Sequence, residues 1–173
     1  MRTWLRVPLA SVAALLLVAL GASITRQLAG GAVSVALAVP VIVWLGLETP
    51  VIEGAVGAAI VGAILDVAAG GPSGLLTFLA VLAFVGVRAG AGPFDARSAT
   101  GFALLSGTAT FAMGLGAVVL LRYVSPAGTE PGWGLLGRVT VEALLTAIAA
   151  PPIRLALDRV VVPAHRDNPA VLR

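Results

Sequence analysis

The sequence predicts an all-α polytopic membrane protein with six transmembrane helices and with both termini in the cytoplasm. Of its 173 residues, 59% are hydrophobic and only 11% are charged, and the mean hydropathy is +1.05. A water-soluble domain of this size needs far more polar surface than this composition supplies. Apolar runs long enough to cross a bilayer follow one another, separated by short polar or Gly/Pro-containing breaks. The arginines are also distributed unevenly between the two sides that alternating spans would define.

The apolar runs predict one integral membrane domain over residues 1–173. We expect spans at residues 7–24, 31–47, 50–69, 74–87, 99–121 and 135–157, followed by a short cytoplasmic tail at 158–173. With the N-terminus inside, the inner segments carry Arg2, Arg6, Arg88, Arg97, Arg154, Arg159, Arg166 and Arg173. The outer segments carry Arg26, Arg122 and Arg138. This excess of arginine inside is the distribution that the positive-inside rule requires.

The first two runs contain features that need a separate interpretation. Arg2 and Arg6, followed by an apolar core and the small residues 21–23, are also typical of a cleavable signal peptide. We prefer a first transmembrane helix because the rest of the chain is equally apolar. In the second run, Pro40 is expected to kink the middle of the helix. Trp44, near the end of that run, is expected at the membrane interface.

The third run has a regular stripe of small residues that ends in an acid. Gly54, Ala58, Gly62 and Asp66 recur every fourth residue and therefore share one helix face. Small residues on a face let a second helix approach closely in lipid. A buried acid costs roughly 2.5–3.5 kcal/mol at mid-membrane on insertion scales, unless a protein group meets it. We therefore predict a helix-packing surface with a polar anchor near its end.

A glycine-proline break follows this stripe. Gly70, Gly71 and Pro72 are typical of a helix end. The fourth helix is expected to begin at about Gly74. The two helices therefore form a hairpin with a short turn.

The depths of the charged residues predict a partner for Asp66. If all spans alternate, the third and sixth helices are antiparallel, and Asp66 and Arg138 lie about 24 and 28 Å from the inner boundary. A long arginine side chain can cover the difference. Glu53 and Arg154 also match in depth, but Glu53 and Asp66 face different sides of their helix. We therefore predict an Asp66–Arg138 contact.

A second arrangement of these charges remains open. Arg138 and Glu142 are one helical turn apart and can neutralise each other. Asp66 would then be met by backbone amides around Gly70 or by water.

No pattern in the sequence predicts a catalytic, metal or cofactor site. The chain has no cysteine, and its one histidine, His165, is in the tail. No Gly-x-Ser-x-Gly motif occurs, and without lysine a P-loop cannot form. The net charge of +3 is small and is accounted for by topology, so no nucleic-acid partner is expected. We expect a non-enzymatic protein without a cofactor.

The central stretch GAVGAAIVGAILDVAAGGPSGLLTFLAVLAF resembles the rod shape-determining membrane protein family MreD. That family has a glycine-rich helix ending in Leu-Asp, a short Gly/Pro turn, then Gly-Leu and another apolar helix. The matching positions here are Leu65-Asp66, Pro72 and Gly74-Leu75. The late stretch LLTAIAAPPIRLAL is also similar, with Ala150-Pro151 at the family's Ala-Pro. The second proline, Pro152, departs from the pattern, and the rest of the chain matches only as apolar helix.

The resemblance implies a membrane scaffold of the bacterial cell-elongation machinery, involved in rod-shape determination and in peptidoglycan synthesis along the side wall. The implied location is the bacterial cytoplasmic (inner) membrane. The implied partners are an MreC-like bitopic membrane protein and, directly or indirectly, an MreB-like actin filament and the wall-elongation synthases. The implied helical fold is similar to that of the substrate-binding subunits of energy-coupling-factor transporters. The sequence leaves homo-oligomerisation open.

Two other functions remain as alternatives. The first is a small-molecule (vitamin-type) binding subunit of a transporter, which the fold similarity suggests. Such a subunit needs a polar, usually aromatic-lined pocket, whereas only 5% of this chain is aromatic. The second alternative is a small ion or proton transporter built around Asp66.

Overall fold

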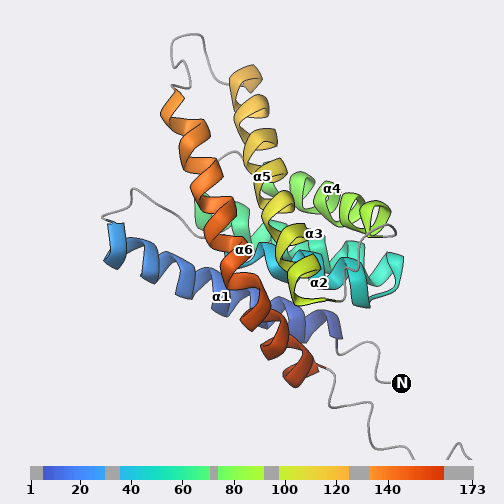
Figure 1. Ribbon diagram of the computed structural model, residues 1–173. Helices are drawn as coiled ribbons and strands as arrows, with labels where there is room; N and C mark the ends of the chain where they lie inside the picture. Colours follow the sequence, from blue (N-terminus) through green and yellow to red (C-terminus); the bar gives the residue numbers. More distant parts are fainter. Residues whose placement is uncertain (1–5, 30–35, 71–73, 92–97, 125–132, 162–173) are drawn as a thin grey trace, which may run out of the picture.

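The computed structural model describes residues 6–29, 36–70, 74–91, 98–124 and 133–161, and all regular structure in these ranges is α-helical (Figure 1). The helices are α1 (Arg6–Ala29), α2 (Val39–Glu48), α3 (Val51–Ala69), α4 (Leu75–Gly90), α5 (Ala99–Val124) and α6 (Trp133–Val161). The predicted all-α class is therefore confirmed.

Three of the described helices are long and apolar enough to cross a bilayer. They are α3, the part of α5 from Ala99 to Leu120, and the part of α6 from Gly134 to Arg159. Large apolar side chains on their outer faces are widely exposed, for example Ile52 at 80%, Val67 at 85% and Ile148 at 75%. Exposed apolar area on this scale indicates a membrane environment. The chain is a helical membrane protein.

Helix α2 lies in the middle of the assembly and contacts each of the other five helices (Figure 1). All its residues from Val39 to Gly46 are buried. A helix that is apolar on every side is buried on every side, because it has no polar face to turn outward. Its ten residues span only about 15 Å, which is half of the hydrocarbon thickness of a bilayer.

Three predictions for this helix are wrong. The helix begins at Val39, because residues 36–38 form a turn, while positions 31–35 of the predicted span lie outside the described residues. Pro40 therefore lies in the first turn, where its missing N–H breaks no helical hydrogen bond, and does not kink a helix middle. Trp44 is 1% exposed and belongs to the core, so it does not lie in an interfacial belt.

Consecutive helices from α3 to α6 run antiparallel. The start of α4 meets the end of α3, and Leu79 near the start of α4 packs beside Gly116 near the end of α5. In the next pair, Gly107 lies beside Ala147 and Gly114 lies beside Val139. Figure 1 shows α5 and α6 side by side. In contrast, α3 and α6 do not pack against each other anywhere in the described residues.

Helix α6 is longer than the sequence predicts. It continues through Pro151 and Pro152 and ends at Val161, so the predicted tail begins inside the helix. The two prolines remove two backbone donors, yet the helix continues without a break from Trp133 to Val161. Residues 162–173 of the predicted tail, including His165, lie outside the described residues. The extension places Asp158 on a helix face, where it takes part in the packing described below.

Candidate functional site

Asp66, the acid of the resemblance motif, joins α3 to the start of α4. Its Oδ1 accepts a hydrogen bond from the backbone N–H of Leu76 at 2.8 Å. Its Oδ2 accepts from the backbone N–H groups of Gly74 and Thr77, both at 3.0 Å, and from the Thr77 hydroxyl at 2.6 Å. The first N–H groups of a helix have no partner in their own helix and carry partial positive charge. The carboxylate therefore caps α4 from the neighbouring helix, and we call this arrangement the Asp66 clasp.

Two glycines give the hairpin the geometry that the Asp66 clasp requires. Gly70 ends α3 with φ of 64°, and Gly74 precedes α4 with φ of 93°. These left-handed values favour glycine, which has no Cβ to clash with its own backbone. Pro72 of the predicted break lies outside the described residues. The turn returns the chain so that the N-terminus of α4 faces the last turns of α3.

The small-residue stripe of α3 lies against α4. Ala58 and Gly62 are buried, and a Cβ added at Gly62 would lie 2.5 Å from the Thr77 Cα. A Cβ added at Gly54 would lie 2.5 Å from Cε2 of the Phe84 ring. The two helices are therefore packed almost backbone to backbone near the clasp, which only glycine permits.

The predicted contact between Asp66 and Arg138 is wrong. Asp66 makes no ion pair in the described residues, because its carboxylate oxygens are engaged by the start of α4. Arg138 lies on the exposed side of α6, and α6 does not pack on α3. Matching depths therefore did not identify neighbours. The second predicted arrangement, in which backbone amides meet Asp66, is correct in the type of partner. The amides belong to the start of α4, however, and not to the residues around Gly70.

The depth-matched residues Glu53 and Arg154 do not pair in the described residues either. Glu53 Oε2 is enclosed and has no hydrogen-bond partner there. The Arg154 guanidinium instead lies 3.6 Å from Asp158 Oδ2 and 5.2 Å from the centroid of the Phe102 ring. Its Nη1 also donates to the Ser98 carbonyl at 3.4 Å. Arg154 thereby connects the end of α6 to the start of α5.

Asp158 also holds the central helix. The indole Nε1 of Trp44 donates to Asp158 Oδ1 at 2.9 Å. A buried indole needs such a partner, because an unpaired N–H in an apolar core is costly. No role was predicted for Asp158 because the cytoplasmic tail was expected to begin at this residue. The Arg154–Asp158 spacing of four residues is the signal that could have extended the helix.

The end of α2 is capped from α4. Arg88 Nη1 donates to the Thr49 carbonyl at 2.9 Å and to the Gly46 carbonyl at 3.5 Å. The last carbonyls of a helix have no partner within it and favour a nearby cation. Arg88 and the Trp44–Asp158 hydrogen bond therefore fix the same end of the buried helix.

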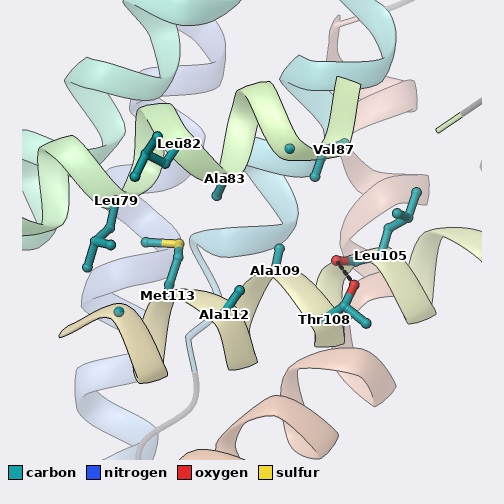
Figure 2. Close-up of a pocket in the computed structure, with 11 residues that line it drawn as sticks. Leu79, Leu82, Ala83, Val87, Leu105, Thr108, Ala109, Ala112 and Met113 are labelled. Atoms are coloured by element: carbon teal, nitrogen blue, oxygen red, sulfur yellow. Dashed lines mark hydrogen bonds between the residues drawn. The ribbon is translucent and has the colours of Figure 1, made fainter. Parts of the chain in front are cut away.

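An open groove with a volume of about 420 Å³ lies between α4 and α5 (Figure 2). Its lining is formed mainly by apolar side chains, among them Leu79, Leu82, Leu105 and Met113. The one hydroxyl in the lining belongs to Thr108 and is bonded to the carbonyls of its own helix at Leu104 and Leu105. The groove therefore presents an apolar surface.

The polar contacts described above thus serve mainly to cap helices and to join them to one another. Pro151, the remaining residue of the resemblance motifs, is half-buried on α6 beside the fully buried Ala150. These features define the chain as a membrane protein of tightly packed helices. In comparisons with known proteins, no family model, no curated protein and no solved structure matches the chain.

Proposed function

We propose that the protein is a non-enzymatic membrane scaffold of the bacterial cell-elongation machinery, of the MreD type. The observation that carries the proposal is the Asp66 clasp. The Leu-Asp and Gly-Leu pairs on which the resemblance rests lie at the two ends of the clasp, where Asp66 meets Gly74 and Leu76. A motif that holds a helix hairpin together is what a scaffold needs. The proposed location is the cytoplasmic membrane.

The proposed topology has six crossings with both ends in the cytoplasm. Its support is that the C-terminal ends of α2, α4 and α6 and the start of α5 are joined by Arg88, Arg154 and Asp158. These ends would share the inner side, where arginine is favoured. In this topology α2, which spans only about 15 Å, is the shortest of the six described helices.

Reporter fusions test the proposed topology. Fusions after Arg97 and after Arg173 should report a cytoplasmic position, and a fusion near Thr129 should report an external one. The reason is the strict alternation of α3 to α6 combined with the arginine excess on one side. A periplasmic reading after Arg173 would mean that the count of crossings is wrong, with the first run acting as a cleaved signal peptide.

Depletion in the source bacterium tests the proposed role. Loss of the protein should turn rod-shaped cells round, and the affinity-tagged protein should recover an MreC-like bitopic protein from solubilised membranes. Gly62→Ala, whose added Cβ would lie 2.5 Å from the Thr77 Cα, should complement the deletion poorly, whereas the matched control Gly86→Ala, whose added Cβ would meet no atom within 4 Å, should complement it fully. Normal shape after clean deletion, in a strain without a paralogue, would refute the scaffold role.

The transporter alternatives find less support. A vitamin-type binding subunit needs polar groups that converge on its ligand, whereas the α4–α5 groove offers one hydroxyl that is already bonded to its own helix. An ion or proton path through Asp66 would need a carboxylate that is free to exchange partners. Asp66 instead accepts four hydrogen bonds from the start of α4.

A further inference from the structure

Two buried hydroxyl groups, one on α5 and one on α6, have no hydrogen-bond partner among the described residues. Ser106 and Thr146 are both 0% exposed, and among the described residues neither hydroxyl has a hydrogen-bond partner. The threonine hydroxyls of Thr108, Thr110 and Thr140 on the same two helices each donate to a carbonyl of their own helix. A carbonyl of the preceding helical turn is thus available to a hydroxyl on these helices, but the Ser106 and Thr146 hydroxyls do not donate to one.

The two hydroxyls lie in one layer of the helix pair. Gly107 and Ala147, the next residues along each helix, approach so closely that a Cβ at Gly107 would lie 3.1 Å from the Ala147 Cβ. Because the two helices are antiparallel, Ser106 and Thr146 lie on opposite sides of this contact along the helix axis and differ in height by only about 3 Å. Thr110, one turn further along α5, is 5% exposed, and its hydroxyl retains a free acceptor site after donating to the Ser106 carbonyl at 2.8 Å.

An apolar membrane interior makes such a layer unfavourable as long as it is empty. A buried hydroxyl that has lost its water and gained no partner is destabilising, and more so where the local dielectric constant is low. Ordered water molecules occupy such places in proteins when two to four polar groups converge. The layer can supply this number from the Ser106 and Thr146 hydroxyls and from the remaining acceptor site of Thr110.

We propose that Ser106 and Thr146 bind an ordered water molecule that links α5 to α6 in the protein interior. The ligand class is water because both hydroxyls are fully enclosed and neither lines the α4–α5 groove. The water accepts from one hydroxyl and donates to the other. It thereby connects the two helices where Gly107 already brings them close.

Apolar replacements of similar shape test the proposal by the sign of their effect. If water is bound, Ser106→Ala and Thr146→Val should each lower the melting temperature of the purified protein, because each leaves the water with an unmet bond. If the layer is empty, each should raise it, because an unpaired buried hydroxyl is removed. Thr140→Val is the matched control, since its hydroxyl is exposed and bonded to its own helix. A rise for both variants overturns the proposal.

A high-resolution structure of the full-length protein in detergent or nanodiscs gives a test that needs no variant. We expect a density peak within hydrogen-bonding distance of both the Ser106 Oγ and the Thr146 Oγ1. A direct hydrogen bond between the two hydroxyls would also destabilise the single variants, but it would show no such peak. Absence of the peak, with or without a direct bond, overturns the proposal.

Discussion

Asp66→Ala should destabilise the purified protein by about 2–3 kcal/mol, the combined loss of a helix cap and of charge-assisted hydrogen bonds at a partly exposed site. The change removes the acceptor for three backbone N–H groups and for the Thr77 hydroxyl. Gly74, Leu76 and Thr77 would then begin α4 with unmet donors. Chemical unfolding in mixed detergent micelles, compared with wild type, measures this loss.

Asp66→Asn separates charge from shape in this prediction. Asparagine keeps one acceptor oxygen, but its amide nitrogen is a donor and would face the donors of α4. The single oxygen of asparagine can take the place of Oδ2 and keep three of the four bonds, so the variant should lose less stability than Asp66→Ala, through the lost charge and the contact of its amide with the Leu76 N–H. A near-wild-type Asp66→Asn would mean that the negative charge contributes little to the clasp.

Arg138→Ala is the control that tests the corrected pairing. Because α3 and α6 do not pack together, its effect and that of Asp66→Ala should add in the double variant. A double variant no less stable than Asp66→Ala alone would restore the predicted contact between the two residues. Additive losses would support the assignment of Asp66 to α4.

The sequence did contain a signal that Asp66 serves the next helix. An acid in the last turns of a helix faces the negative end of its own helix dipole, which disfavours it there. The same acid stabilises the positive N-terminus of a helix that follows a short turn. Only eight residues separate Asp66 from Gly74, whereas Arg138 is far away in sequence and needs the whole fold to be placed correctly. The start of α4 was therefore the partner that local sequence alone could predict for Asp66.

The apolar pattern predicted where α3, α4 and α5 lie, because each is a continuous apolar run with a glycine or polar break at its ends. It could not predict α2, because a run of apolar residues does not distinguish a lipid-facing helix from a buried one. Pro40 could have indicated a helix start at Val39. The burial of Trp44 depends on Asp158, a residue more than a hundred positions later, and no local signal contains that contact.

For the small-residue stripe, too, the local property could be predicted from the sequence and the tertiary contact could not. The spacing of Gly54, Ala58 and Gly62 gave their common face, because helical periodicity is a local property. It could not state that α4 is the helix they contact. The choice of α4 follows from the positive φ values of Gly70 and Gly74. They direct the chain back so that α4 packs on the α3 face that carries the small residues and Asp66.

Gly62→Ala should give a large loss of stability for the addition of a single methyl group. The added Cβ would lie 2.5 Å from the Thr77 Cα, 2.9 Å from the Ala80 Cβ and 3.0 Å from the Leu76 carbonyl oxygen. Two of these neighbours are backbone atoms, so α4 itself must move. Overpacking that shifts the backbone typically costs about 1–3 kcal/mol, so we expect a loss near the upper end of this range. The same movement would pull Leu76 and Thr77 away from Asp66 and weaken the clasp.

Gly86→Ala on α4 provides the matched comparison in the same hairpin. Its Cβ would meet nothing within 4 Å, so the variant should be neutral or more stable by up to about 1 kcal/mol, the helix-propensity difference between glycine and alanine. Both variants add one methyl group to a helical glycine, so the difference between them reports close packing alone. If Gly62→Ala unfolds at the same denaturant concentration as Gly86→Ala, then α3 and α4 are not in backbone contact at Thr77, and the packing surface assigned to the stripe is wrong.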